Sequence, residues 1–472
     1  LLLGVCFVFP MDALGAGYWN LSQGLSIYGR GGAAITTAFD PTTLQINPAN
    51  LAGLLGLQFI VGSDMILDLR YVDRADNPKG EGFAEITLER ADNIIPWVRP
   101  PRPHVFLSYN LSALNLPELS VGLGVWGPPR SDQVFEKPNK GEVPKGAQRY
   151  SAVRNENAQI HTGMGISYEL PWSKLKIGGS LIFIQEIIDL GMSLGTYAPF
   201  WDKQDPDYDA YANLTAEALW IPNFNFGFSM EVTEWLRVAG SFQSHFDVNA
   251  SGKIHVTFGR GLDGYGAELI GDEITLLAKL PAVVRLGIAY FETQRNFDIE
   301  LAFTWEGWGR NDYVELTPVD SKIAVSEDLA PLLEGKTRFD LANIRINNYF
   351  RDTYSVRLGS SWWPVEDIVQ LHHGIYFEAS AVPSEWLTTA SLDLPKMGVT
   401  SGFRWFILGG MHFDTTFGYS YWFEKTVTNS KYELSNTLAG AGFDATVGTI
   451  GNGSYGNTQL YLLLALGGKF NI

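Results

Sequence analysis

Apolar and polar side chains alternate with a period of two along much of this chain. From Phe297 to Glu306 the odd-numbered positions are all apolar, and most even-numbered positions are polar. The stretch 411–424 places aromatic residues such as Phe417 and Tyr421 on one face and polar residues on the other. Because successive side chains of a β-strand point to opposite faces, this period predicts strands rather than helices.

Segments of this kind predict about fourteen strands, an even number that suits a closed antiparallel barrel. Their apolar faces run for about ten residues and several end in aromatic side chains, which is typical of strands that face lipid. The predicted strands are 57–73, 103–111, 118–127, 150–170, 174–195, 214–231, 235–257, 266–291, 294–307, 350–363, 366–379, 396–408, 410–427 and 456–472.

The connections between these strands alternate in length. Short turns at one end and long loops at the other are typical of a transmembrane barrel, whereas a soluble β-sandwich has no reason to sort its loops. One connection, 258–265, is short where a long one is expected. The long connections are 74–102, 128–149, 196–213, 308–349, 380–395 and 428–455.

The composition is compatible with a membrane barrel. No apolar run reaches the roughly 18 residues that a membrane helix needs, and only 18% of the residues are charged. A chain of this kind spans a membrane as a closed barrel, in which all backbone hydrogen bonds form between strands. We therefore predict an all-β fold, with residues 57–472 forming a transmembrane antiparallel β-barrel.

The first 15 residues are expected to be the remnant of a secretory signal peptide. Leu1 to Pro10 is apolar, and 13–15 reads Ala-Leu-Gly, a small-x-small cleavage pattern. An apolar first strand is the alternative. The only cysteine, Cys6, lies in this remnant, so the mature chain would contain no disulfide.

Residues 16–56 do not alternate and are predicted to form a hatch, a compact plug in the barrel lumen. Glycine and alanine are frequent, as in 29–34, so that the backbone can pack closely. The Asp40-Pro41 and Asn47-Pro48 steps break helices and begin turns.

With these features the chain resembles the FadL/TodX (OmpP1) family of outer-membrane transporters for hydrophobic compounds. Members carry a glycine-rich N-terminal hatch that ends in an Asn-Pro-Ala motif, matched here by Asn47, Pro48 and Ala49. A second match is the aromatic-basic-acidic-x-aromatic stretch 350–354, followed by Ser-Ala-Val-Pro at 380–383. The resemblance covers nearly the whole chain after the signal remnant.

The resemblance implies a plugged fourteen-stranded barrel in the bacterial outer membrane, gated at the Asn-Pro-Ala motif of the hatch. It also implies a break in the third strand, here 119–126, that opens sideways towards the membrane. We expect this lateral opening at Gly127, Pro128 and Pro129, where proline cannot donate to the strand ladder. The alternative is that these prolines only begin the external loop.

Apolar side chains on the lumen face are expected to bind the ligand. Ile182, Ile184 and Ile188 share a strand face with Glu186. Such residues suit the path of an apolar molecule, and packing against the hatch is an equal alternative.

Two arginines are candidate ligands for a carboxylate, because the resemblance implies that fatty-acid members place basic residues in the lumen. Arg351 and Arg357 face the lumen if Tyr354, Val356 and Leu358 face lipid. The alternative is that they pair with lumen carboxylates or the hatch. The fifth strand departs from the family pattern, because its polar residues are Gln185, Glu186 and Asp189 rather than basic ones.

Other patterns point away from different functions. The net charge of −17 argues against nucleic acid. Gly122, Gly124 and Gly127 fit a dinucleotide pattern, but prolines rather than a helix follow, so small lumen-facing residues explain them better. His372 and His373 point to opposite strand faces and cannot share a metal. With no nucleophile elbow or paired carboxylates, the sequence predicts no enzyme, cofactor or metal site.

We therefore predict passive transport of hydrophobic small molecules, long-chain fatty acids or aromatic hydrocarbons, across the outer membrane. The barrel would act as a monomer and release its ligand sideways into outer-membrane lipid. A structural or secretion-associated barrel of the same fold, which transports no lipid, is the main alternative. The predicted hatch disfavours a water-filled porin.

Overall fold

The computed structural model describes residues 24–37, 39–75, 83, 88–94, 102–127, 133–198, 201–292, 296–333, 335–438, 443–444 and 446–470. The predicted signal remnant lies outside the described residues, as do Pro128 and Pro129. In the part described, no helix is long and apolar enough to cross a membrane.

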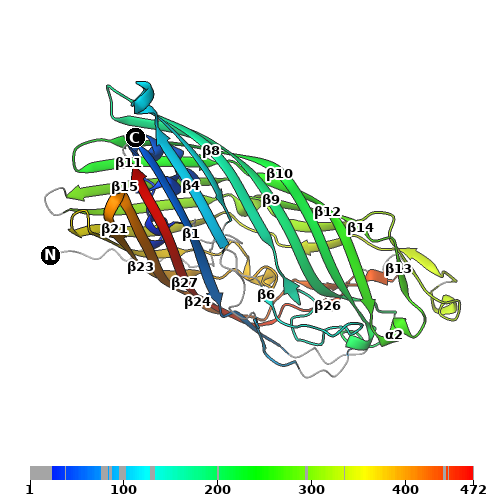
Figure 1. Cartoon of the computed structure of the whole chain (residues 1–472). Coiled ribbons are helices and arrows are strands. Elements are labelled where there is room, and N and C mark those ends of the chain that lie inside the picture. The colour runs from blue at the N-terminus through cyan, green and yellow to red at the C-terminus, as the bar shows by residue number, and fades with distance from the viewer. Residues whose placement is uncertain are drawn as a thin grey trace.

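Fourteen antiparallel strands form a closed barrel, as the alternation predicts (Figure 1). The first and last strands close the barrel by pairing with each other from Leu57 opposite Phe470 to Asp68 opposite Gln459. The barrel strands are β1 (Leu57–Asp68), β4 (Arg102–Asn110), β5 (Leu119–Trp126), β8 (Ala158–Leu170), β9 (Leu175–Gly195), β10 (Asp209–Glu231), β11 (Leu236–Gln243), β15 (Val283–Glu292), β16 (Phe297–Glu306), β21 (Thr353–Val365), β22 (Val369–Glu378), β23 (Lys396–Phe406), β24 (Met411–Val427) and β27 (Gly453–Phe470).

The β16 strand shows how the sequence positions the wall. Its even-numbered residues, among them Asp298 and Glu300, are buried on the lumen side, while Leu301 and Phe303 are exposed on the outside. A large number of apolar side chains are exposed in the same way around the barrel. This exterior matches the predicted lipid-facing band, because water would disfavour so large an apolar surface.

Several predicted strands and loops differ from the structure. Segment 57–73 divides into β1 and β2 (Tyr71–Arg74), and the strand predicted to begin at 150 begins at Ala158. Segment 235–257 divides into β11 and β12 (Phe246–Phe258), and segment 266–291 divides into β14 (Glu273–Leu280) and β15. The supposed loop 308–349 contains β17 (Tyr313–Pro318) and β20 (Ile344–Asn347), and β12, β14, β17 and β20 pair in that order. The 258–265 connection, which holds α2 (Arg260–Asp263), is short because the strands themselves continue outward (Figure 1).

The polarity of the wall inverts where this outward extension begins. On β10 the outward side chains Phe224, Phe226 and Phe228 are exposed, whereas Thr215 and Glu217 take that face before the bulge at 218–221. Trp220, inside the bulge, adopts a left-handed φ of 61°. We call residues 209–218 of β10, with β12, β14, β17 and β20, the collar. An exterior that changes from aromatic to polar marks the external edge of the lipid-facing band.

The inner face of the collar is apolar and buried. It forms one cluster with apolar residues from the segment 319–341, which covers it. The covering segment includes β18 (Lys322–Ala324), η7 (Ala330–Leu332) and β19 (Arg338–Asp340), and β18 pairs with β13 (Glu268–Ile270). The collar residues of this cluster include Ala212, Leu214, Ala216, Val248, Ala250, Ile254, Ile274, Leu276, Leu316, Ile344 and Ile346.

Candidate transport site in the lumen

Within its described residues, the hatch contains three short helical segments: α1 (Leu25–Gly29), η1 (Pro41–Gln45) and η2 (Pro48–Gly53). Each 3-10 segment begins with a residue whose side chain caps the helix, followed by proline. Proline suits the first helical position because the backbone N–H that it lacks would have no partner within the helix there. The Asp40 carboxylate accepts from the Thr42 amide at 3.0 Å, and the Asn47 side chain accepts from the Ala49 amide at 3.2 Å.

The Asn-Pro-Ala motif joins the hatch to the wall. Asn47 donates to the carbonyl oxygens of Ile35, at 2.9 Å, and Phe228, at 3.1 Å. Ser167 on β8 donates to the Ala49 carbonyl oxygen at 2.6 Å. Residues 47–49 are buried. Their hydrogen bonds connect the hatch to β10 and to β8. The predicted gating role of the motif stays a prediction.

Lumen-facing glycines let the hatch backbone lie directly against the wall. A Cβ atom built on Gly178 would lie 2.6 Å from the Ala49 nitrogen, and one on Gly374 would overlap the Arg30 backbone. Gly122, which belongs to the dinucleotide-like pattern, faces Leu51 of the hatch. Gly359 likewise faces the hatch backbone, and three further glycines, like Gly122, face side chains of the hatch. We call the whole set the glycine seat: Gly122, Gly165, Gly178, Gly227, Gly287, Gly359 and Gly374.

Two buried arginines clamp the hatch to two different parts of the wall. Arg30 of the hatch pairs with Asp298, and its Nη2 lies 3.6 Å from Glu300, both on β16. Arg404 on β23 lies 2.8 Å from Asp40 of the hatch and 2.7 Å from Asp414 on β24. Because every charged group here is almost fully buried, each one needs its oppositely charged partner to offset the cost of desolvation.

The two candidate arginines occupy different environments. Tyr354, Val356 and Leu358 are exposed on the outside, as predicted, and Arg357 is buried in the lumen. Arg357 pairs with Glu378 and donates to the Gly31 carbonyl oxygen at 2.9 Å, so it links wall to hatch. Arg351 precedes β21 and is exposed, so the strand does not orient it and it does not join this lumen cluster.

Ile182, Ile184 and Ile188 lie together on the lumen face of β9. All three are buried in the apolar cluster that contains Phe106 and Trp126, whose rings stack with centroids 5.3 Å apart. The adjacent lumen residue Glu186 accepts a hydrogen bond from Gln159 on β8. Burial alternates along β9 from Ser180 to Leu190, which places these isoleucines on the lumen side as the sequence predicts, but their role in binding stays a prediction.

Arg285 is a candidate that the sequence analysis missed. It lies on β15 and faces the barrel lumen, between Val283 and Gly287. A Cβ atom on Gly287 would lie 3.1 Å from Ile35 and Thr36 of the hatch. The Arg285 side chain is 9% exposed and donates to Gln243 Oε1 at 3.1 Å, but its Nη1 has no hydrogen-bond partner among the described residues.

Along the described residues, the strand pairing of β5, the predicted third strand, with β8 ends before β8 does, and we call this step at Gly127 the notch. The pairing of β5 with β8 ends at Trp126 opposite His161, yet β8 continues to Ala158 against β9. Gly127 follows directly, and the lumen side of the notch carries the rings of Phe106, Trp126 and His161. Further out, Arg102 Nη2 donates to the Asn157 carbonyl oxygen at 3.4 Å across the notch.

The external loops are tied together by a buried polar cluster. Arg149 lies 2.8 Å from Asp209, and Tyr150 donates to the same carboxylate at 2.9 Å. Tyr197, from the connection between β9 and β10, shares a hydrogen bond of 3.0 Å with Tyr150. Burial raises the pKa of the Tyr150 hydroxyl well above its ordinary value, so it remains a donor.

Fold and site together define a plugged outer-membrane β-barrel whose lumen is apolar beside the notch. Residues 22–453 match the family model for outer membrane protein transport protein (OMPP1/FadL/TodX), so the chain belongs to this family. The family consists of outer-membrane transporters of hydrophobic compounds rather than enzymes.

Solved structures share the fold. A Pseudomonas aeruginosa FadL homologue matches with a TM-score of 0.74 and 16% identity over 96% of this chain and 100% of its own. The P. putida toluene transporter TodX matches with a TM-score of 0.64 and 12% identity over 96% and 100% of the two chains. The Ralstonia pickettii toluene transporter TbuX gives 0.60 and 13% over 96% and 99%. No curated protein matches significantly in sequence.

Proposed function

We propose that this barrel transports an apolar molecule with a carboxylate head, and that Arg285 binds the head. The observation that carries the proposal is the unpartnered Nη1 of this buried guanidinium among the described residues. A buried guanidinium nitrogen without an acceptor is costly, and a ligand carboxylate would supply the acceptor that Nη1 lacks. The other buried lumen arginines Arg30, Arg357 and Arg404 are already paired with carboxylates.

Residues around Arg285 favour a ligand that is apolar beyond its head group. Gln243, which accepts from Arg285, donates in turn to Asn223 at 3.1 Å, and Asn223 pairs in register with Ile182 on β9. This polar row therefore ends beside Ile182 and Ile184. A head at Arg285 would let its tail lie along these isoleucines, which is the usual pattern of a few polar groups in an apolar site.

Replacing Arg285 by methionine is expected to weaken the binding of palmitate about ten- to hundredfold, since a hydrogen bond to a charged group contributes about 1.5–3 kcal/mol. Binding of toluene, which has no head group, should stay unchanged. Equilibrium dialysis of the detergent-solubilised protein with each probe measures both.

Arg351→Met is the matched control, because Arg351 is exposed and lies outside the strand. Its palmitate affinity should equal that of the unsubstituted protein. Equal affinities for Arg285→Met and the unsubstituted protein would remove Arg285 from the site. A protein that binds neither palmitate nor toluene would contradict transport of hydrophobic ligands itself.

For the exit, we propose lateral release through the notch at Gly127. The early end of β5 supports it, because β5 follows β8 only as far as His161 in the described residues. The aromatic rings on the lumen side of the notch would guide an apolar ligand towards it. Release at this height delivers the molecule directly into lipid.

Gly127→Trp places a bulky side chain at the notch, where a Cβ atom would already lie 2.7 Å from the Gln159 carbonyl oxygen. It is expected to lower palmitate uptake about tenfold or more while leaving palmitate binding intact, because a blocked exit slows release. Uptake is measured in cells that depend on this barrel for growth on palmitate. Leu123→Trp, on the lipid-facing side of the same strand, serves as control and should transport normally. Normal uptake by Gly127→Trp would argue for an exit elsewhere.

A further inference from the structure

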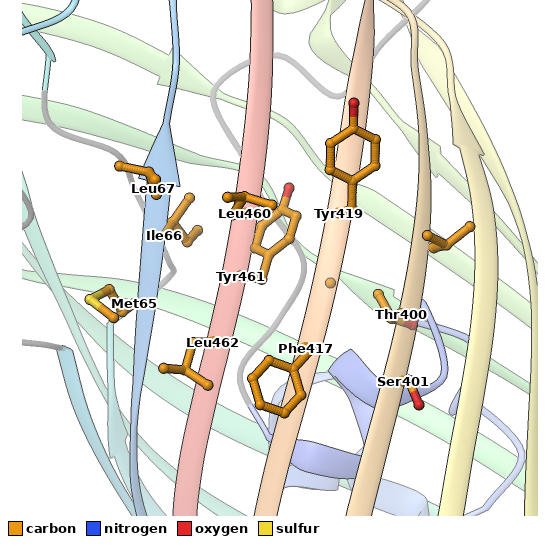
Figure 2. Close-up of a pocket in the computed structure, with 12 residues that line it drawn as sticks. Met65, Ile66, Leu67, Thr400, Ser401, Phe417, Tyr419, Leu460, Tyr461 and Leu462 are labelled. Carbon is orange, nitrogen blue, oxygen red and sulfur yellow. The ribbon is translucent and has the colours of Figure 1, made fainter.

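A row of buried polar side chains crosses the lumen face of the wall on neighbouring strands. Lys396, Trp422 and Asn457 lie opposite one another on β23, β24 and β27, which Figure 2 shows side by side with β1. Arg70, between β1 and β2, lies opposite Asn457, because β1 and β2 pair with β27 in one continuous register. None of the four is more than 5% exposed. We call them the polar row.

The outer face of the wall shows the height of the polar row. Tyr421 and Phe423, the neighbours of Trp422 in the sequence, are exposed on the outside, and the exposed Glu424 and Lys425 follow them. A change from aromatic to charged side chains marks the edge of the lipid-facing band. Because β24 then leads into the long connection that ends at β27, this is the external edge. The polar row therefore lies where a molecule from outside would enter the lumen.

Several polar atoms of the row have no hydrogen-bond partner among the described residues. They are both the nitrogen and the oxygen of the Asn457 carboxamide, Nε1 of Trp422 and Nε of Arg70. Oδ1 of Asp68, the carboxylate beside Arg70, has none either. Buried polar groups are nearly always paired with protein, ordered water or a ligand. Donors and acceptors are thus both available to a bound molecule in one small region.

The charges of the row are already balanced, which favours an uncharged group on the ligand. Arg70 lies 3.0 Å from Asp68, and Lys396 lies 3.1 Å from Glu378. A carboxylate would accept from the donors but would repel the oxygens of Asn457 and Asp68, since it has no proton to give. A hydroxyl donates one hydrogen bond and accepts up to two, so it can pair with an oxygen and an N–H of the row at once.

Apolar side chains beside the row suit a ligand that is apolar beyond its hydroxyl. Trp422 and Tyr455 pack in one buried cluster with Val382, Leu387 and Leu394 of the external connection 380–395. The polar row thus borders an apolar cluster. A few polar groups in apolar surroundings are the usual composition of a small-molecule site.

We propose that the polar row binds the hydroxyl group of an apolar alcohol that enters from the external side. The hydroxyl donates to the oxygen of Asn457 and accepts from Nε1 of Trp422, and the apolar part of the alcohol lies against the cluster around Tyr455. The site adds uncharged alcohols to the ligands of the barrel. It does not depend on Arg285 or on a carboxylate.

Nuclear magnetic resonance of the detergent-solubilised protein with isotope-labelled tryptophan tests this site, with 1-octanol as the probe. The Nε1–H resonance of Trp422, assigned by its loss in Trp422→Phe, should shift and saturate during the titration. The alkane n-octane, which has no hydroxyl, should leave it in place. Asn457→Leu should weaken the affinity for 1-octanol about tenfold, as the loss of a neutral hydrogen bond predicts. Asn249→Leu, the same exchange at an exposed position of the collar, is the matched control.

The other indole resonances report whether each variant is folded, and Asn457→Ala replaces Asn457→Leu if the latter is not. A Trp422 resonance that 1-octanol does not shift would mean that water alone satisfies the polar row, and the proposal would fail. Equal affinities of Asn457→Leu and the unsubstituted protein would overturn it as well. Binding of 1-octanol without binding of palmitate would count against the Arg285 site and leave the polar row supported.

Discussion

Gly178→Val is expected to unseat the hatch and to make the barrel leak small hydrophilic solutes. A side chain at Gly178 would meet the backbone of Ala49 and Pro48 at 2.6–2.7 Å, and a backbone cannot rotate away as a side chain does. Overpacking of this kind costs about 1–3 kcal/mol, which raises the open fraction about five- to hundredfold. Sugar influx into proteoliposomes measures the leak.

The adjacent Gly179 provides the control for this substitution. Its Cβ would face Phe226 on the outside at 3.1 Å, and that ring can shift into lipid. Gly179→Val should therefore leave the barrel closed. A tight barrel in Gly178→Val would show that the hatch adapts to the wall and that the glycine seat is not needed to hold it.

Period-two alternation predicted most of the wall, because it follows directly from strand geometry. The third strand was predicted at 119–126, and β5 spans Leu119 to Trp126. The same alternation placed Ile182, Ile184 and Arg357 on the lumen side. Each of these inferences needs only the neighbours of a residue in the sequence.

The collar could not be predicted in this way. Alternation identifies a strand but does not tell which of its faces meets lipid, water or the lumen. On β10 the two faces exchange polarity at the bulge around Trp220, so a pattern of lipid-facing residues stops while the strand continues. The sequence predicts a loop at 308–349, because the short strand β17 depends on its distant partner β14, and β20 in turn pairs with β17.

Arg285 escaped prediction for a related reason. In the sequence it looks like Arg357, since both alternate with apolar residues on a strand. Arg357 meets Glu378 and the hatch, whereas the Nη1 of Arg285 meets no acceptor among the described residues. This difference depends on side chains that are distant in sequence, so only the three-dimensional arrangement distinguishes a structural arginine from a candidate ligand.

Arg30→Met is expected to release the hatch more strongly than any other single change to its polar contacts. Asp298 and Glu300 would both lose a buried guanidinium, and removing one partner of a buried ion pair costs about 3–5 kcal/mol. Hydrogen exchange at the Gly32 amide, which donates to Ile27 within the hatch, should accelerate about a hundred- to several-thousandfold.

Neutralising the two carboxylates that lose their cation tests the cause of this release. Asp298→Asn with Glu300→Gln in the Arg30→Met background should recover much of the protection, because the carboxamide oxygen introduced by Glu300→Gln would still accept from the amide of Ile35. Lys253→Met, which removes an exposed ion pair with Asp272, should change nothing measurable. Unchanged exchange in Arg30→Met would mean that Arg30 is not needed to hold the hatch, and that the glycine seat and the Arg404 clamp suffice. Acceleration without recovery in the triple variant would assign the effect to the packing of Arg30 against Phe39, whose ring lies 5.2 Å from the guanidinium.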